Sequence, residues 1–469
     1  MQKDSFDLVV IGGGSAGFSG AIKASDLGAS VVMIDGGTIG GTCVNVGCVP
    51  SKRMLTVGDV YYYGDHDYNG ITLTREDLQI GPIVKEKDDL VLDMRRNKYA
   101  KVIHDLPNTK YIEGSARFVS RNEVKVNGRR IKGKHFLLAA GSSSTIPDFK
   151  GLRNVDYLTN VEALSPRKKP ESLIVIGGRV LGLEFAQMYA HFGTKVTLLQ
   201  RSSTIIPDEE PEISEALRQY LQEEGIAIHT GVKIKEIRKK GRRKVVSTIS
   251  SGQKKEYEGE QILMATGRTP NTESLGIRDI GVKLDDKGAV KVNSEMCSSL
   301  PNIWAAGDII GDPMLETVAA KEGSIAAHNA FSKKTSKRKM DFMAVPHAIF
   351  TMPQVASVGW TDLEANQKGI TCSCNWIPMS SVAKAGIVGD TRGLVKLVID
   401  NETKRVLGVH ILSSLAADMI HEGALIVKFK LTIDDIIDTV HIFPTMSEAI
   451  KLAAQSFYKD IDKMSCCTE

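Results

Sequence analysis

Residues 6–35 read FDLVVIGGGSAGFSGAIKASDLGASVVMID, and this stretch decides the fold class. A short apolar run ends at Ile11, a glycine-rich turn and a helical pattern follow, and a second apolar run ends on Asp35. This order predicts a dinucleotide-binding unit, which consists of a strand, a glycine turn, a helix, a second strand and an acidic residue. The glycines let the backbone approach a pyrophosphate at the helix N-terminus, and the Asp35 carboxylate can accept a hydrogen bond from a ribose hydroxyl.

Two cysteines follow this unit within residues 40–52, GGTCVNVGCVPSK. Cys43 and Cys48 are five residues apart, a separation that spans about 7.5 Å along an α-helix. Disulfide-bonded Cα atoms lie about 4.4–6.8 Å apart, so a bridge between these cysteines needs a distorted turn. Gly47 permits such a turn.

The setting of the two thiols favours a redox-active pair. We expect a helix over 42–57, and both its N-terminus and the positive charge of Lys52 would lower a thiol pKa. A buried structural pair is the alternative. A zinc site is a weaker interpretation, because no second pair of ligands follows at a suitable spacing.

A second nucleotide unit is predicted further along the chain. A strand over 173–176 precedes the turn GGRVLG at 177–182, and a strand over 195–199 follows the next helical pattern. Arg179 replaces the middle glycine, which weakens the match. No acid follows the second strand, and the arginine there, Arg201, suits a 2′-phosphate, so we predict NADPH rather than NADH. A solvated charge at the strand end is the alternative.

The two units share a further pattern that indicates how the domains are arranged. Each is closed by a strand that ends in small residues, FLLAAG at 136–141 and ILMATG at 262–267, so the second unit is interpreted as an insertion in the first. The predicted class is α/β, with two Rossmann-like domains and a C-terminal α+β domain. The expected boundaries are 1–150 and 276–335 for the first domain, 151–275 for the second and 336–469 for the third.

Composition excludes several classes of protein. The 469 residues are 42% hydrophobic and 25% charged, with a net charge of +4, which is too small to argue for nucleic-acid binding. The basic clusters at 239–244 and 333–339 are interpreted as solvated loops. No apolar run approaches the length of a membrane span, and no signal peptide precedes Phe6. Seven cysteines do not form a disulfide scaffold, so we expect a cytoplasmic protein.

Two further cysteines, Cys466 and Cys467, are adjacent in the polar C-terminal tail. Adjacent cysteines form disulfides only with strain, whereas two soft thiolates side by side suit a soft metal ion. An inert tail and a thiol relay, as in thioredoxin reductases, are the alternatives.

Together these motifs resemble the flavin disulfide reductases, the class I pyridine nucleotide-disulfide oxidoreductases, over nearly the whole chain. KLAAQSF at 451–457 and SCC at 465–467 are similar to the mercuric reductases of that family. The resemblance implies a homodimer in which the tail of one subunit reaches the active site of the other. It also implies that Lys52 and Glu184 pair beside the flavin. FAD is implied in the first unit and NADPH in the second, with cofactor-binding residues Gly12, Gly14, Ser15, Ala16, Gly17, Asp35, Gly41, Thr42, Lys52, Ala116, Gly141, Gly177, Gly182, Glu184, Arg201, Gly267 and Asp308.

The sequence departs from the family at the acid–base position. In members that act on thiol substrates, a histidine–glutamate pair supplies the proton, but Phe443 stands where that histidine should be, although Glu448 is present. Phenylalanine cannot transfer a proton, which disfavours lipoamide and glutathione chemistry. The mercuric reductases usually carry tyrosines at this position and where Val180 stands.

The resemblance therefore implies mercury(II) reduction. NADPH would reduce FAD, Cys466 and Cys467 would deliver Hg²⁺ to Cys43 and Cys48, and Hg⁰ would leave. In this hypothesis all four cysteines are catalytic and metal-binding; Cys48 lies against the flavin and Cys43 exchanges ligands. Dihydrolipoamide dehydrogenase or another disulfide reductase is the first alternative, and a flavoprotein that sequesters soft metals without reducing them is the second.

Overall fold

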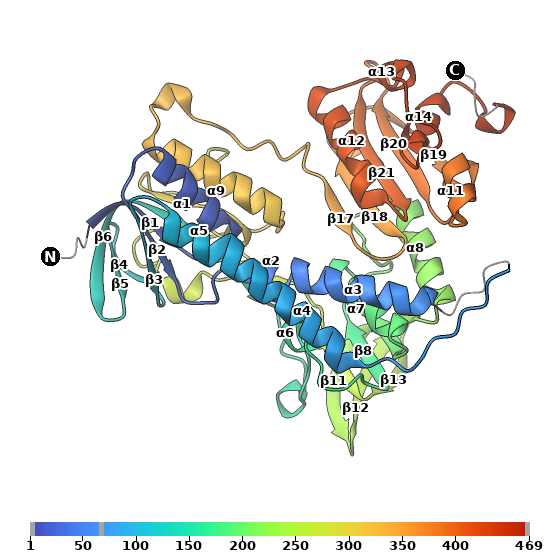
Figure 1. Cartoon of the computed structure of the whole chain (residues 1–469), viewed down its shortest axis with the longest axis horizontal. Helices are drawn as coiled ribbons and strands as arrows, with labels where there is room; N and C mark the ends of the chain where they lie inside the picture. Colours follow the sequence, from blue (N-terminus) through green and yellow to red (C-terminus); the bar gives the residue numbers. More distant parts are fainter. Residues whose placement is uncertain (1–4, 65–69, 465–469) are drawn as a thin grey trace.

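The computed structural model describes residues 5–64 and 70–464, apart from the side chains of Lys334 and Asp462. Figure 1 shows three parts: a sheet with α1 and α9, a second sheet near α7 and α8, and a third sheet with α12 and α14. Strands and helices alternate in the first two parts, and the third has an antiparallel sheet. This arrangement confirms the predicted α/β class.

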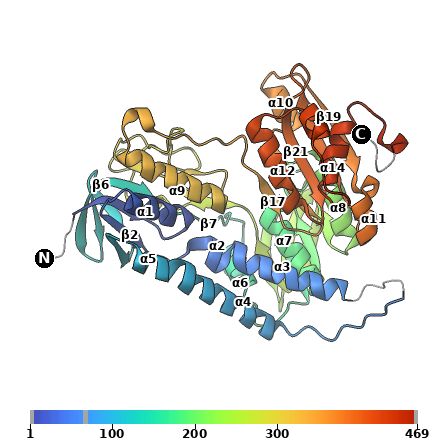
Figure 2. The ribbon, with the colours of Figure 1, turned by 45° about the horizontal axis from the view of Figure 1, so that its top comes forward.

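The first sheet has seven strands in the order β3-β2-β1-β6-β5-β4, with β16 also paired to β6. β1 is parallel to both β2 and β6. The apolar residues of the opening stretch explain this core, because every residue of β2 is buried. Helices α1 and α9 lie side by side over the sheet (Figure 2). The bounds are β1 Ser5–Ile11, α1 Ser15–Asp26, β2 Val31–Asp35, β3 Thr109–Glu113, β4 Arg117–Ser120, β5 Glu123–Val126, β6 Arg129–Leu138, β16 Ile303–Ala305 and α9 Glu316–Phe331.

The second sheet is fully parallel, in the order β10-β9-β8-β14, and the chain between β10 and β14 forms a three-stranded antiparallel sheet, β11-β12-β13. β8 and β9 form where the apolar runs predicted strands. The bounds are β8 Ser172–Ile176, α7 Val180–His191, β9 Lys195–Leu199, α8 Pro211–Glu223, β10 Ala227–His229, β11 Lys233–Lys240, β12 Arg243–Ser250, β13 Gln253–Gly259 and β14 Gln261–Met264.

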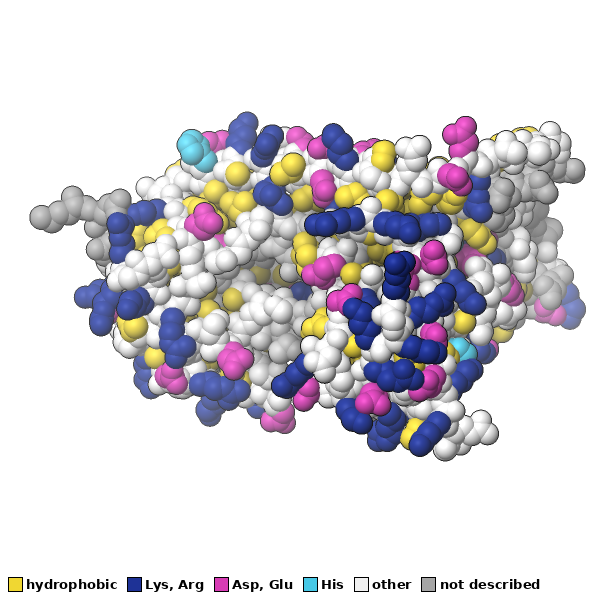
Figure 3. All heavy atoms as spheres, turned by 90° about the horizontal axis from the view of Figure 1, so that it is seen from below, with side chains coloured by type: hydrophobic (Ala, Val, Ile, Leu, Met, Phe, Trp, Pro, Cys, Tyr) yellow, Lys and Arg dark blue, Asp and Glu magenta, His cyan; other side chains and the backbone are white. Residues whose placement is uncertain are grey.

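The basic cluster at 239–244 is not the solvated loop that we expected. Most of it lies on β11 and β12, and Lys244 is buried, with its ammonium 2.7 Å from Asp156. Lys240 pairs with Glu258 across the sheet at 2.6 Å. Figure 3 shows acidic side chains interspersed among the basic ones on this face. The local charge is therefore partly balanced by carboxylates that are distant in sequence.

The third sheet is antiparallel, in the order β17-β18-β21-β20-β19. Strand β19 lies at one edge of this sheet and is partly polar. The bounds are β17 His347–Ile349, β18 Gln354–Gly359, α10 Asp362–Gln367, β19 Cys372–Pro378, α11 Ala383–Val388, β20 Leu394–Asp400, β21 Val406–Ser413, α12 Ala416–Phe429, α13 Ile433–Asp438 and α14 Glu448–Gln455. Among the described residues, none of the helices has the length and apolar character that a bilayer crossing requires.

The helices after the first unit connect the parts. The single helix expected over 42–57 is wrong: the chain forms α2, Gly41–Val46, and α3, Cys48–Tyr63, with a break at Gly47. A long helix follows as α4, Ile80–Met94, a π-helical turn η1, Arg95–Ala100, and α5, Lys101–Asp105. The short elements β7, Ser142–Ser144, and β15, Arg268–Pro270, pair beside the first sheet, and α6 is Asn160–Ala163.

Candidate active site

The first glycine turn brings the backbone of two strands into contact. Gly12 has a φ of +117°, and a Cβ atom there would lie 2.1 Å from the carbonyl oxygen of Ala139 on the neighbouring chain segment. Any side chain would therefore force the turn away from the sheet. A Cβ at Gly17 would likewise lie 2.0 Å from the Gly12 carbonyl oxygen. The two glycines hold the N-terminus of α1 at the carboxyl edge of the sheet.

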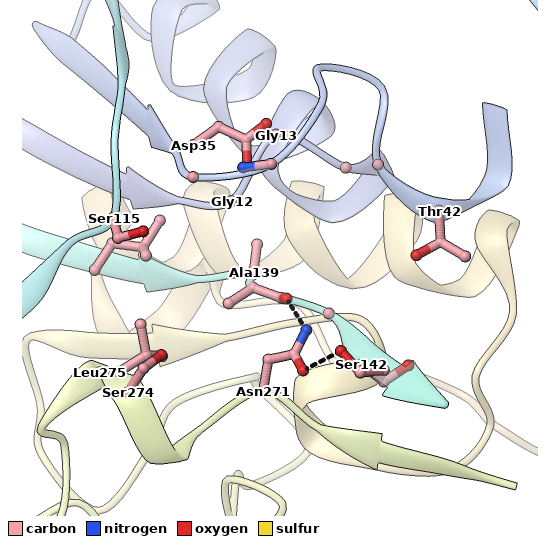
Figure 4. A pocket seen from close by; sticks show the side chains of 18 of the residues that line it. Gly12, Gly13, Asp35, Thr42, Ser115, Ala139, Ser142, Asn271, Ser274 and Leu275 are labelled. Carbon is pink, nitrogen blue, oxygen red and sulfur yellow. Dashed lines mark hydrogen bonds between the residues drawn. The ribbon is translucent and has the colours of Figure 1, made fainter. Parts of the chain in front are cut away.

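A cavity of about 800 Å³ opens at this edge (Figure 4). The Oδ1 atom of Asp35 accepts a hydrogen bond from the Gly37 N–H at 3.2 Å, whereas Oδ2 is buried and has no partner among the described residues. An unpaired buried carboxylate oxygen is costly, so the cavity is suited to a ligand that donates a hydroxyl at this point. The predicted residues on its walls are Gly12, Gly14, Asp35, Gly41, Thr42, Ala116 and Gly141.

A smaller cavity of about 190 Å³ adjoins the first, with which it shares wall residues, and contains the thiol pair. The predicted residues on its walls are Gly14, Ser15, Ala16, Thr42, Cys43, Cys48, Gly141 and Asp308. The structure thus brings the cysteine stretch against the end of the nucleotide cavity, as expected from their order in the sequence.

The break between α2 and α3 brings the thiols together. A Cβ at Gly47 would lie 2.8 Å from the Thr42 carbonyl oxygen and 3.2 Å from the Cys43 Cα, so only glycine allows this close approach. Cys43 lies in α2, and Cys48 is the first residue of α3. Both are free thiols within hydrogen-bonding distance of each other.

The two thiols of the pair differ in pKa. The hydrogen bond from Cys43 and, to a lesser extent, the charge of Lys52 together lower the pKa of Cys48 to about 7, against the effect of burial. The same hydrogen bond, together with burial, raises the pKa of Cys43. A reactive thiolate is thus available near neutral pH, with its partner as a protonated thiol.

Lys52 is held by a buried carboxylate. Its ammonium lies 2.7 and 2.9 Å from the two oxygens of Glu184, which is only 4% exposed and also accepts the Phe350 N–H at 3.0 Å. The pair joins α3 to α7. Its geometry agrees with the pairing that the resemblance implied, one helical turn from Cys48.

The second glycine turn has the same local geometry as the first. Gly177 has a φ of +115°, and a Cβ at Gly182 would lie 1.9 Å from its carbonyl oxygen. Arg179 does not cross the turn, because its guanidinium is paired with Asp208. Arg201 is exposed and forms no ion pair within the described part of the chain.

The strand that closes the second unit contributes Gly267 just after β14, with a φ of +106°. Its carbonyl oxygen accepts the Thr145 N–H at 2.9 Å, which joins the second unit back to the first. The predicted residues of the second unit therefore lie on one edge of the second sheet.

Comparison with known proteins identifies the family to which this architecture belongs. A family model described as pyridine nucleotide-disulphide oxidoreductase matches residues 6–323. The chain belongs to this family. The dimerisation domain of the same family matches residues 345–454, which supports the expected homodimer for this oxidoreductase.

Relatives of this oxidoreductase include mercuric reductases. That of Staphylococcus aureus is 40% identical over 463 residues, which cover 98% of this chain and 84% of the relative. That of Lysinibacillus sphaericus is 40% identical over 468 residues, 100% of this chain and 85% of the relative. Among solved structures, the HOCl-induced flavoprotein disulfide reductase RclA from Escherichia coli is similar with a TM-score of 0.86 and 27% identity, covering 97% of this chain and 100% of that one.

Several polar residues of the oxidoreductase site were not anticipated. Asn271 donates to the Ala140 carbonyl oxygen at 2.9 Å on the wall of the larger cavity. Arg268 lies 3.6 Å from Asp308 and donates to Ser142 at 2.7 Å, and Glu316 accepts a hydrogen bond from Ser15 at 2.9 Å. No sequence motif marks these side chains, because each becomes part of the site only through contacts between distant segments.

The acid–base position differs from that of thiol-reducing members as expected. Phe443 is 50% exposed, and Val180 is 43% exposed. His441 lies 2.8 Å from Glu422 rather than beside Glu448, whose Oε2 atom is buried without a partner among the described residues. No imidazole therefore pairs with Glu448 in the described part of the chain. Cys466 and Cys467 lie outside the described residues.

Proposed function

We propose that this oxidoreductase is an NADPH-dependent mercury(II) reductase. The observation that carries the proposal is the thiol pair itself: two free cysteines line a small cavity that shares wall residues with the nucleotide-sized cavity, and position 443 has no imidazole. Two soft thiolates suit a soft metal ion. Reduction of a metal ion, unlike reduction of a disulfide substrate, does not require a proton donor at position 443. The 40% identity to mercuric reductases supports the same substrate.

FAD and NADPH are the cofactors that this family implies, and the residues present fit them. The free Oδ2 atom of Asp35 would accept a ribose hydroxyl of FAD, and the turn at Gly12 would leave room for its pyrophosphate. Arg201, which forms no ion pair with any other described residue, would hold the 2′-phosphate of NADPH. When bound, the flavin supplies two-electron transfer from NADPH to the thiol pair and the metal.

The remaining assigned residues would support these contacts. Lys52, oriented by Glu184, would place a positive charge beside the thiols. The ion pair between Asp308 and Arg268 would stabilise the wall of the smaller cavity. Gly177 and Gly182 would let the second turn approach the pyrophosphate of NADPH. The domain boundaries at residues 150, 275 and 335 are part of this proposal.

The thiol pair would act in two ways. The Cys48 thiolate, with its lowered pKa, and the Cys43 thiol would together bind Hg²⁺ by displacing its thiol ligands. In the homodimer, Cys466 and Cys467 of one subunit would deliver the metal to this pair in the other. A cytoplasmic location belongs to the proposal, because a reducing compartment keeps such thiols free.

The decisive experiment measures NADPH oxidation and loss of volatile mercury when the purified holoenzyme receives HgCl₂ with excess thiol. We expect mercury-dependent oxidation and release of Hg⁰. Turnover with dihydrolipoamide or an oxidised thiol but not with mercury would instead identify a disulfide reductase. Mercury binding without Hg⁰ release would identify a sequestering protein.

The delivery role has its own test. The variant Cys466→Ala/Cys467→Ala should lose at least about tenfold in turnover of thiol-bound mercury, because ligand exchange would lose its first acceptor. The variant Cys372→Ala/Cys374→Ala, which removes two cysteines on β19, is the matched control and should retain turnover. Equal rates for the tail variant and the wild type would contradict delivery by the tail.

A further inference from the structure

Glu316 separates the thiol cavity from an open groove. It is the first residue of α9 and lines the 190 Å³ cavity together with Cys43 and Cys48. It also lines a groove of about 340 Å³ formed by α1, η1 and α9. Ser15, which donates to the Glu316 carboxylate at 2.9 Å, is likewise common to both. Glu316 thus borders both the thiol cavity and the groove.

The side chains around Glu316 hold it in this position. The Ser15 hydroxyl is hydrogen-bonded to Tyr99 as well as lying beside Glu316, and the Tyr99 ring packs edge-on against Phe18 at 4.9 Å. The negative charge of Glu316 also raises the pKa of both thiols, although less than their hydrogen bond and burial affect them. The other charged groups on the walls of the groove are Lys23 and Asp26 from α1 and Lys98 from η1. Those on the wall of the thiol cavity are Arg268 and Asp308, and the charge of Lys52 from α3 also acts on Cys48.

Ligand exchange at the thiol pair requires a proton to move. When Cys43 replaces a thiol ligand of Hg²⁺, its S–H bond breaks, a new Hg–S bond forms, the old Hg–S bond breaks, and the proton ends on the departing thiolate. No electrons are transferred in this step. Phe443 cannot carry that proton. Two carboxylates, Asp308 and Glu316, line the cavity that contains both thiols. Asp308 accepts a hydrogen bond from Ser142 and lies 3.6 Å from Arg268, whereas Glu316 also lines the open groove.

We propose that Glu316 is the acid–base group of thiolate exchange, taking the proton from Cys43 and returning it to the departing thiol. The inference rests on the proposed mercury chemistry and adds a proton path to it. The groove gives Glu316 contact with solvent on the face of α1 and α9. The hydrogen bond from Ser15 positions the carboxylate.

Glu316→Gln tests the proposal because it keeps the shape and removes the charge. Alkylation of the reduced Cys43 and Cys48 by iodoacetamide, followed by peptide mapping, should shift to lower pH by about one unit, since a neighbouring negative charge is lost. Mercury turnover should instead fall by about tenfold or more, since general acid–base catalysis is lost. Faster alkylation with slower turnover is a combination that structural damage does not produce.

Two more variants complete the test. Glu316→Asp should restore part of the turnover, and Glu316→Ala should regain turnover on addition of acetate through the groove. Asp26→Asn is the matched control: it removes a carboxylate of the groove that does not line the thiol cavity, and both measurements should match the wild type. Unchanged alkylation in Glu316→Gln, or full turnover without added acetate in Glu316→Ala, would overturn the proposal.

The test of Glu316 can fail or succeed independently of the test of mercury reduction. The alkylation profile needs only the reduced thiols and no mercury. If the wild type released no Hg⁰, mercury reduction would be excluded as the function. An unshifted alkylation profile in Glu316→Gln would instead exclude Glu316 as the acid–base group, whatever the substrate.

Discussion

Replacing Lys52 with methionine should raise the pKa of Cys48. Lys52 lies one helical turn after Cys48 in α3, which places the two side chains about 6 Å apart. With an effective dielectric constant of about 20, the attraction at this distance is about 2.8 kcal/mol. The Lys52 side chain is 32% exposed, so we halve this value for solvent screening, to about 1.4 kcal/mol or one pH unit.

The pKa of Cys48 should therefore rise from about 7 to about 8. At pH 7 the thiolate fraction would fall from about half to about a tenth, and turnover would fall with it because the thiolate is the reactive form. The assay is the pH dependence of Cys48 alkylation in the reduced holoenzyme, resolved by peptide mapping. Lys52→Arg keeps the charge and is the matched control.

The double variant Lys52→Met/Glu184→Gln separates the effect of Lys52 on the pKa of Cys48 from a loss of stability. Lys52→Met alone leaves the buried Glu184 carboxylate without its ammonium partner, which costs about 1–3 kcal/mol of stability. The double variant removes that unpaired charge and should show the same shift at Cys48. A Cys48 profile that is the same in the wild type, Lys52→Met and Lys52→Arg would refute the electrostatic role of Lys52.

Two further predictions concern the nicotinamide site and the pH dependence of stability. Arg201→Ala should raise KM for NADPH about tenfold and leave KM for NADH unchanged, because a charge-assisted contact to the 2′-phosphate is lost; equal effects on both nucleotides in steady-state assays would contradict this. His191 is buried between Asp59 at 2.9 Å and Glu224 at 3.1 Å, and its pKa is raised by these carboxylates against the effect of burial. Its contribution to stability is therefore full below about pH 6.5 and lost as pH rises through the raised value. The Tm difference between the wild type and His191→Gln should shrink from pH 6 to pH 9, and a difference that grows would show the opposite linkage.

The sequence alone determined the two nucleotide units and the place of the thiol pair between them. These features are local: a positive φ at Gly12 and a short apolar strand beside it are set within a few residues. The strand over 195–199 therefore has the predicted bounds. The resemblance to the flavin disulfide reductases added the Lys52–Glu184 pair, which no local pattern contains.

The sequence indicated that Gly47 permits a distorted turn, but the tertiary structure was needed to show that the helix breaks there and that a polar wall surrounds the thiols. The helix pattern over 42–57 continues through the glycine, and the break is visible only in how closely its backbone approaches Thr42. Glu316 is 301 residues from Ser15, and each side chain taken alone resembles an ordinary helix-terminal polar residue. Contacts between segments so far apart depend on how the sheets and helices pack, and the residue types of a single chain do not encode that packing locally.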